Sequence, residues 1–136
     1  MTYILDACAL IALLKKEQGA DKVRALLDEA YAGQSVIHMN IVNLIEVYYL
    51  FHRTLGREKS GLILEKIYTM PIQFIETIDA VIFSEASRLK AQYAIPLGDC
   101  IGLATAFKMN GVFVTSDHHD LDTVEKNEAV KFFWFR

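Results

Sequence analysis

The stretch TYILDACALIALLKK, residues 2–16, decides how the rest of the sequence is interpreted. Its first residues, Thr2–Leu5, form a short β-prone run that ends at Asp6, and Ala7–Lys16 are strongly helix-prone. A strand that passes directly into a helix is the unit from which α/β proteins are built. We therefore expect an α/β fold in which an acidic side chain stands where the first strand ends.

The alternation of strand and helix continues along the whole chain. Further strands are predicted at Ser35–Met39, Gln73–Ile75, Val112–Thr115 and Val130–Phe135. Further helices are predicted at Asp21–Ala32, Ile41–Thr54, Glu58–Thr69, Asp79–Ala94 and Cys100–Met109. Because no linker, repeat or low-complexity segment interrupts this order, we expect one domain over residues 1–136, with a mostly parallel sheet covered by helices on both faces.

Composition limits the classes of protein that fit. The chain has 136 residues, of which 53% are hydrophobic, so it can bury a real core and is not expected to be disordered. The net charge of −3 argues against a protein that binds nucleic acid through bulk positive charge. It does not exclude a nucleic-acid enzyme that neutralises its own acidic groups with metal ions.

The cysteines and the N-terminus indicate a cellular compartment. Cys8 and Cys100 form no CxxC pattern, which fits a reducing cytosol better than a disulfide scaffold. The N-terminus differs from a signal peptide because Asp6 interrupts it and its positive residues follow the apolar run. Since no stretch approaches the roughly 18–20 apolar residues of a membrane span, we expect a soluble, cytoplasmic protein.

Four acidic residues fall where a parallel sheet gathers its ligands, beyond the carboxyl ends of the strands. Asp6 ends the first predicted strand, and Asp117 follows the strand Val112–Thr115. Asp99 precedes a helix, and Glu46 lies in the second turn of the helix that leaves the second strand. Asn43 is one turn before Glu46 on the same face. These side chains are expected to converge on one pocket.

Each aspartate also has a purely structural alternative. Asp6 and Asp99 are candidates for helix caps, and Asp117 is a candidate for an Asx turn. Glu46 is harder to explain in this way because it interrupts an apolar stretch. Ionised carboxylates packed in one cleft repel one another, and a hard divalent cation such as Mg²⁺ or Mn²⁺ would relieve that repulsion. With such an ion, water becomes a nucleophile towards a phosphate ester.

Three segments in order, YILDACALIALL (3–14), NLIEVYY (43–49) and PLGDCIGLATAFKMNGVFVTSD (96–117), resemble a PIN domain. The resemblance covers nearly the whole chain. It implies a three-layer α/β/α sandwich and a ribonuclease dependent on Mg²⁺ or Mn²⁺. It also implies the toxin half of a toxin–antitoxin pair of the VapC type, with RNA as substrate, an antitoxin protein as partner and a homodimer as an option. The motifs assign catalysis and metal binding to four residues, Asp6, Glu46, Asp99 and Asp117.

The resemblance also assigns supporting residues. Thr115 matches the threonine of the family's Thr-x-Asp motif, Ser116 lies within that motif, and a hydroxyl there is expected to orient the site. The family often has Ser or Thr two residues after its first aspartate, whereas this chain has Cys8. A thiol is a weaker hydrogen-bond partner than a hydroxyl, so the geometry around Asp6 is left open.

The stretch after Asp117, HHDLD, is rich in ligand-type side chains. A zinc site at His118 and His119 is disfavoured, because adjacent residues do not share a helix face and no HxxxH or CxxC partner is present. Asp120 and Asp122 are expected to cap a short helix running into residues 123–126, with contact of either residue to a metal as the lesser alternative. The stretch is thus predicted to be one functional acid followed by a polar turn.

Positive residues are expected to frame a site that accepts RNA. The candidates lie at the end of the first helix and around Gly56: Lys15, Lys16, Arg53, Arg57 and Lys59. Ordinary solvated helix ends are the alternative. The apolar segment FFWFR, residues 132–136, is expected to form an edge strand, with a dimer contact as the alternative.

Two other functions share features with this sequence. A receiver-type signalling domain also has a parallel sheet and a Mg²⁺-binding acidic pocket. Such domains usually carry paired acids after the first strand and a lysine at the end of the last strand. Here Ala7 follows Asp6, and Lys131 begins the final strand. A catalytically silent PIN fold used as a binding module is the second alternative, and the four intact acids argue against it.

Overall fold

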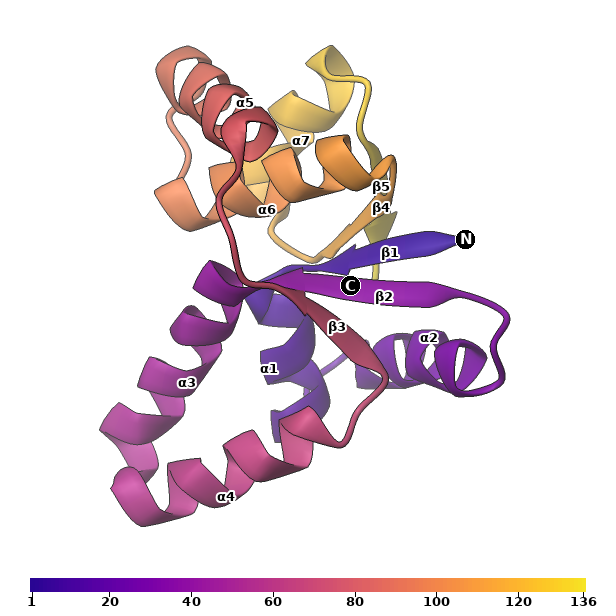
Figure 1. Ribbon diagram of the computed structural model, residues 1–136, viewed down its shortest axis with the longest axis vertical. Coiled ribbons are helices and arrows are strands. Elements are labelled where there is room, and N and C mark those ends of the chain that lie inside the picture. The colour runs from indigo at the N-terminus through magenta and orange to yellow at the C-terminus, as the bar shows by residue number, and fades with distance from the viewer.

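The computed structural model describes all 136 residues and has a five-stranded sheet at its centre (Figure 1). The strand order is β3-β2-β1-β4-β5, and all four pairings are parallel. The strands are β1 (Thr2–Leu5), β2 (Val36–Asn40), β3 (Ile72–Ile75), β4 (Val112–Thr115) and β5 (Lys131–Trp134). The predicted parallel sheet is confirmed, and so is the position of FFWFR in an edge strand.

Helices cover both faces of this sheet, as predicted. In Figure 1 the helices from the first half of the chain lie on one side of the sheet, and the later helices lie on the other. The first group is α1 (Ala7–Lys15), α2 (Ala20–Tyr31), α3 (Ile41–Leu55) and α4 (Arg57–Tyr68); the second is α5 (Ala80–Gln92), α6 (Leu97–Met109) and α7 (His118–Asn127). The molecule is therefore a three-layer α/β/α sandwich.

Alternating side chains of the central strand supply two hydrophobic cores. Tyr3 and Leu5 of β1 belong to the core that includes residues of α1 to α4. Ile4, between them, belongs to the core that includes residues of α5, α6 and α7. This follows from the period of two in a strand, where successive side chains point to opposite faces. A strand buried on both faces must be apolar throughout, which explains the unbroken run at residues 3–5.

Two strands pass into helices without an intervening loop. Asp6 caps α1, and its Oδ1 accepts a hydrogen bond from the Ala7 amide at 2.8 Å. Asn40 ends β2 and caps α3, with its Oδ1 accepting from the Val42 amide at 2.9 Å. Short polar side chains are favoured at such caps because they satisfy free amides of the first helical turn. The residues that follow each strand are thereby held at the carboxyl edge of the sheet.

The strand order changes direction between β1 and β4. The chain runs from β1 outward through β2 to β3, and then returns to place β4 on the other side of β1. The connections from β1 and from β4 therefore leave towards opposite faces of the sheet (Figure 1). In open α/β sheets, such a switch point leaves a crevice outside the carboxyl ends of the two strands, and ligands bind there. Asp6 and Asp117 lie at this point.

Two helix starts differ from the sequence prediction. Helix α6 begins at Leu97, with Pro96 at the N-cap position, so Asp99 lies inside the first turn and does not cap the helix. Helix α7 begins at His118 and is capped by Asp117. The predicted polar turn after Asp117 was therefore wrong, whereas the helix expected to run into residues 123–126 is present and begins earlier, at His118. The other predicted elements are present, with their ends shifted by a few residues.

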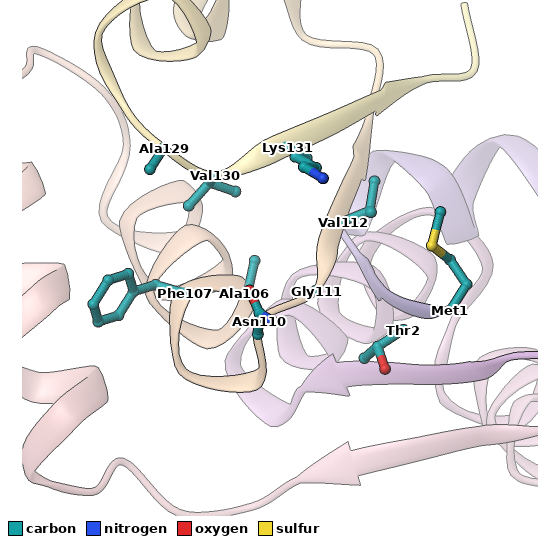
Figure 2. A pocket seen from close by; sticks show the side chains of 10 residues that line it. All are labelled: Met1, Thr2, Ala106, Phe107, Asn110, Gly111, Val112, Ala129, Val130 and Lys131. Carbon is teal, nitrogen blue, oxygen red and sulfur yellow. The ribbon is translucent and has the colours of Figure 1, made fainter.

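The amino edge of the sheet has a hollow of about 310 Å³ (Figure 2). Its lining includes Met1, Thr2 and Gly111, together with Val112 and Lys131, but no carboxylate side chain. It lies at the end of the sheet opposite the acidic residues and is not part of their site. No helix of the molecule combines the length and the apolarity needed to span a membrane.

Candidate active site

Asp6 is buried at the switch point, and three groups donate hydrogen bonds to it. Its Oδ2 accepts from Thr115 Oγ1 at 2.9 Å and from Cys8 Sγ at 3.3 Å, and its Oδ1 accepts from the Ala7 amide. Thr115 Oγ1 also accepts from the Asp117 amide at 3.2 Å. Burial raises the pKa of Asp6, the negative charge of Asp117 raises it further, and the hydrogen bonds oppose these effects. Thr115 thus joins the ends of β1 and β4.

Cys8 supplies one of these bonds to Asp6. Its Sγ also lies 3.5 Å from Thr115 Oγ1. Burial, reinforced by the charge of Asp6, raises the pKa of the Cys8 thiol to about 12. The side chain is therefore a protonated thiol at neutral pH and acts as a donor. The question that the sequence left open is resolved, because the cysteine holds the first aspartate in place as a hydroxyl would.

Glu46 is positioned by the residue one turn before it. The Asn43 side-chain amide donates to Glu46 Oε1 at 3.0 Å and to the Gly98 carbonyl at 3.0 Å, which links α3 to the start of α6. Gly98 lies so close that a β-carbon there would overlap Glu46 Oε1. Burial raises the pKa of Glu46, the bond from Asn43 lowers it, and the charge of Asp6 raises it. The predicted pairing of Asn43 with Glu46 is present in the structure.

Asp99 faces all the other acids. Only 7% of its surface is exposed. Burial raises the pKa of Asp99 to about 8, and the charges of Asp6, Asp117, Glu46 and Asp120 contribute in that order. Helix N-termini favour negative charge. The pKa is raised despite the place of Asp99 in the first turn of α6, so desolvation and like charge outweigh the helix dipole.

Asp117 and Asp120 complete the cluster from α7. The Asp117 carboxylate caps the helix by accepting from the Asp120 amide at 3.3 Å. Carboxylate oxygens of Asp99, Asp117 and Asp120 lie within 4.8 Å of one another. Burial raises the pKa of Asp117. The sequence assigned Asp120 only a cap, with metal contact as the lesser alternative. The signal that points to the site is its spacing of three residues from Asp117, which places both in one turn.

The other predicted residues lie outside this cluster. Ser116 forms no hydrogen bond with the acids, and its hydroxyl oxygen accepts a hydrogen bond from Arg136 at 3.2 Å. Lys15 and Lys16 lie at the end of α1, Arg57 and Lys59 begin α4, and Arg53 lies over the Tyr49 ring. No lysine or arginine forms a hydrogen bond or ion pair with Asp6, Glu46, Asp99 or Asp117.

His118 uses both of its ring nitrogens in contacts within the protein. His118 contacts Asp122 at 2.8 Å through Nδ1 and the Arg136 carbonyl at 2.9 Å through Nε2, and its ring stacks on Trp134. Asp122 therefore pairs with His118 and does not cap a helix as predicted. The only group of side chains with metal-ligand spacing is the one formed by Asp99, Asp117 and Asp120.

The donor set of the cluster suits a hard divalent cation. It consists of carboxylate oxygens, the ligands that Mg²⁺ and Mn²⁺ prefer, and contains no accessible thiolate or imidazole. Burial raises the pKa of Asp6, Glu46, Asp99 and Asp117, and the charge of at least one neighbouring carboxylate raises each pKa further. A cation between them would replace this repulsion by attraction.

Comparison with known proteins places this geometry in context. The sequence matches the profile described as PIN domain over residues 3–127. No curated protein sequence matches the chain.

Solved structures resemble the whole molecule. VapBC2 from Rickettsia felis, bound to a DNA fragment from its promoter, has a TM-score of 0.76 at 16% identity, with 98% of each chain covered. DNA-bound VapBC from Salmonella typhimurium has a TM-score of 0.76 at 14% identity, covering 100% of this chain and 99% of that one. VapC20 from Mycobacterium tuberculosis, described as a toxin that cleaves the sarcin–ricin loop, has a TM-score of 0.62 at 14% identity, covering 82% and 86%. At these identities the likeness establishes a shared fold.

Proposed function

This chain belongs to the PIN domain family, and from that premise we propose that it is a metal-dependent ribonuclease, which hydrolyses RNA phosphodiester bonds at its acidic cluster. The observation that carries the proposal is the convergence of acids from distant parts of the sequence at the switch point of the sheet. Asp99 lies in the electrostatic field of Asp6, Asp117, Glu46 and Asp120, and its pKa is raised to about 8. Groups with strongly raised pKa values in a crevice are typical of functional sites.

We assign metal binding and catalysis to Asp6, Glu46, Asp99 and Asp117, with Asp120 as a further ligand. Mg²⁺ or Mn²⁺ bound there would lower the pKa of water and stabilise the charge that develops on the phosphate. The chain itself fixes the carboxylates: Thr115 and Cys8 hold Asp6, and Asn43 holds Glu46. Because these donors are placed before substrate arrives, little reorganisation is needed during the reaction.

The experiment that tests this proposal is cleavage of a single-stranded RNA in Mn²⁺ and in EDTA. Wild-type protein should release fragments with 5′-phosphates in Mn²⁺ and none in EDTA. Asp99→Asn should lower the rate by at least about 100-fold, as expected when a group that stabilises the transition state is lost. Asp28→Asn, an exposed aspartate of α2, is the matched control and should leave the rate unchanged. Cleavage that persists in EDTA and in Asp99→Asn would refute the proposal.

We further propose that the chain is the toxin component of a toxin–antitoxin pair. The support is the overall likeness to VapBC complexes. A second support is an apolar face on α3 and α4, where Ile45, Tyr49, Leu62 and Tyr68 are exposed. Monomeric proteins rarely leave such a face open, so it is a candidate for the antitoxin. When the chain is expressed alone in the cytoplasm of bacterial cells, growth of the cells should stop, and Asp99→Asn should restore growth. Equal growth of cells that contain equal amounts of wild-type and mutant protein would exclude toxin function.

Two structural proposals complete this account. Residues 1–136 form one domain, because both hydrophobic cores share the strands of a single sheet. A homodimer is proposed through the exposed apolar side chains of α5 and α6, which include Phe83 and Leu97. The molecular masses of wild-type protein and of Phe83→Asp, measured by light scattering, would test this proposal. A monomer mass for wild type as well as for Phe83→Asp would exclude the dimer.

The alternative functions differ in their support. Receiver domains share a strand order of 2-1-3-4-5. The order here is β3-β2-β1-β4-β5, so the receiver alternative is set aside. A silent binding module with a PIN fold would keep the sheet but would have no need of a desolvated acidic cluster, and the cleavage experiment separates it from an enzyme.

A further inference from the structure

Arg136 lies beside the acidic site, although the segment that carries it was expected only to complete the sheet. Its Nη2 donates to Ser116 Oγ at 3.2 Å, and Ser116 immediately precedes Asp117. No other lysine or arginine side chain donates a hydrogen bond to one of the five acids or to a residue next to one of them in the chain. Arg136 is therefore the cation whose place at this edge of the site is fixed by a direct contact.

Several contacts hold the backbone of this segment in position. The Phe135 amide donates to the Thr115 carbonyl at 3.2 Å, and His118 Nε2 contacts the Arg136 carbonyl at 2.9 Å. The His118 ring also stacks on Trp134, with ring centroids 3.9 Å apart. These contacts explain why a histidine follows Asp117 in the chain: it fastens the segment after β5 to the first turn of α7.

The turn between α1 and α2 closes on the same segment. Gly19 has φ +88°, and a β-carbon there would overlap the Phe135 carbonyl oxygen, so this position requires glycine. The Gln18 carbonyl accepts from Arg136 Nη1 at 3.1 Å. The guanidinium is thus oriented by two loops, one before α2 and one before α7.

The guanidinium still has capacity for a ligand. It carries five N–H donors, and the contacts described use only Nη1 and Nη2, so Nε has no protein acceptor. Its nearest acidic group is Glu17, with Nη1 3.6 Å from Oε1, and Lys15 Nζ lies 3.7 Å from the other oxygen of the same carboxylate. Two cations share this one carboxylate, so Glu17 alone does not neutralise both of them.

The alternative basic residues are less well placed. Arg57 begins α4, beyond the end of α3 at Leu55, and the part of α3 from Glu46 to Leu55 alone spans about 14 Å at the rise of an α-helix. A phosphate bound at Arg57 would be several nucleotides away from the phosphate bound at the acids. A phosphate bound at Arg136 would be close to the phosphate at the acids.

We propose, resting on the ribonuclease function proposed above, that Arg136 binds a phosphate of the RNA strand adjacent to the one that is cleaved. Planar guanidinium groups bind phosphate through paired N–H donors, and such backbone contacts set the position of a nucleic acid without reading its sequence. Arg136 is a substrate-binding residue, and Ser116 and His118 are positioning residues that act through it. Lys15 extends the same positive rim away from the acids.

The test compares Arg136→Gln with Lys131→Gln. Lys131 is an exposed cation at the opposite end of β5 and is the matched control. In the Asp99→Asn background, which should bind RNA without cutting it, binding of a fluorescein-labelled single-stranded RNA of about 15 nucleotides is measured by anisotropy across a salt titration. Arg136→Gln should weaken binding about 3- to 10-fold and reduce the slope of log Kd against log salt by about 0.7, the loss of one phosphate contact. Lys131→Gln should change neither.

Steady-state kinetics separate binding from a purely structural role. In the active background, Arg136→Gln should raise KM while kcat changes less than about twofold, and Arg136→Lys should recover part of the loss because the charge is kept. Melting curves verify that each variant is folded. If wild-type protein cleaves RNA but Arg136→Gln leaves the salt slope of the Asp99→Asn protein unchanged, this inference is overturned and the proposed function stands. Wild-type protein that cleaves no RNA would overturn both.

Discussion

Asp99 loses most of its contact with water on folding, and it does so among other carboxylates. Its pKa is about 8 in the folded protein, against about 3.9 for an aspartate in an unfolded chain. Between these two values the folded state binds the proton more tightly than the unfolded state does. Ionisation of Asp99 therefore favours unfolding, and the free energy of unfolding falls as the pH rises from about 4 to about 8.

The fall in unfolding free energy with rising pH leads to a prediction about stability in EDTA. Between pH 5 and pH 8, wild-type protein should lose at least about 1 kcal/mol more unfolding free energy than Asp99→Asn, since asparagine cannot ionise and one pKa unit corresponds to about 1.4 kcal/mol. The measurement is urea unfolding of both proteins at the two pH values. Parallel pH dependence of wild type and mutant would show that Asp99 titrates as it does in water.

Helix α6 contributes to the site through the close approach of its first turn to α3. A β-carbon at Gly98 would overlap the Glu46 carboxylate, whereas one at Gly61 of α4 would meet no atom within 4 Å. Gly98→Ala should displace Glu46 and lower RNA cleavage by at least about 10-fold, with a stability change within about 1 kcal/mol because alanine favours helix. Gly61→Ala, the matched control, should keep full activity and gain up to about 1 kcal/mol. Full activity in Gly98→Ala would show that Glu46 is not needed where the structure places it.

The helix starts show what sequence patterns reveal about this fold and what they miss. Gly98 and Asp99 suggested a break before α6, because glycine is a poor helix former and aspartate a good cap. Tertiary packing overrides these local preferences, because position 98 must be glycine for α6 to approach Glu46. Leu121 and Val124 are three positions apart and both buried, so they extend the helical signal of residues 123–126 back into the stretch that was taken for a polar turn.

At the scale of the whole molecule, the topology brings residues 6, 46, 99 and 117 together. The alternating pattern predicts a parallel sheet, and the carboxyl-edge rule then predicts the acidic pocket. Asp120 and Arg136 could not be assigned in the same way. Their positions depend on the start of α7 and on the packing of the segment after β5 against two loops, which no local pattern specifies.

We propose that Asp6, Glu46, Asp99 and Asp117 form one cation site, whose carboxylates destabilise the protein when no cation is bound. The most direct measurement is thermal melting in EDTA and across a Mn²⁺ titration, for wild type, Asp99→Asn, Asp117→Asn and the surface control Asp28→Asn. In EDTA, Asp99→Asn and Asp117→Asn should melt higher than wild type, because asparagine neither carries a repelling charge nor has to take up a proton on folding, and it can still cap α7 at position 117.

Mn²⁺ at about 100 times its Kd should stabilise wild type by roughly 3 kcal/mol, or about 10 °C, and should stabilise the two site mutants less. Asp28→Asn should follow wild type throughout. If both site mutants melt clearly lower than wild type in EDTA, and Mn²⁺ shifts all four proteins alike, the acids are structural caps and the claim of a shared cation site is contradicted.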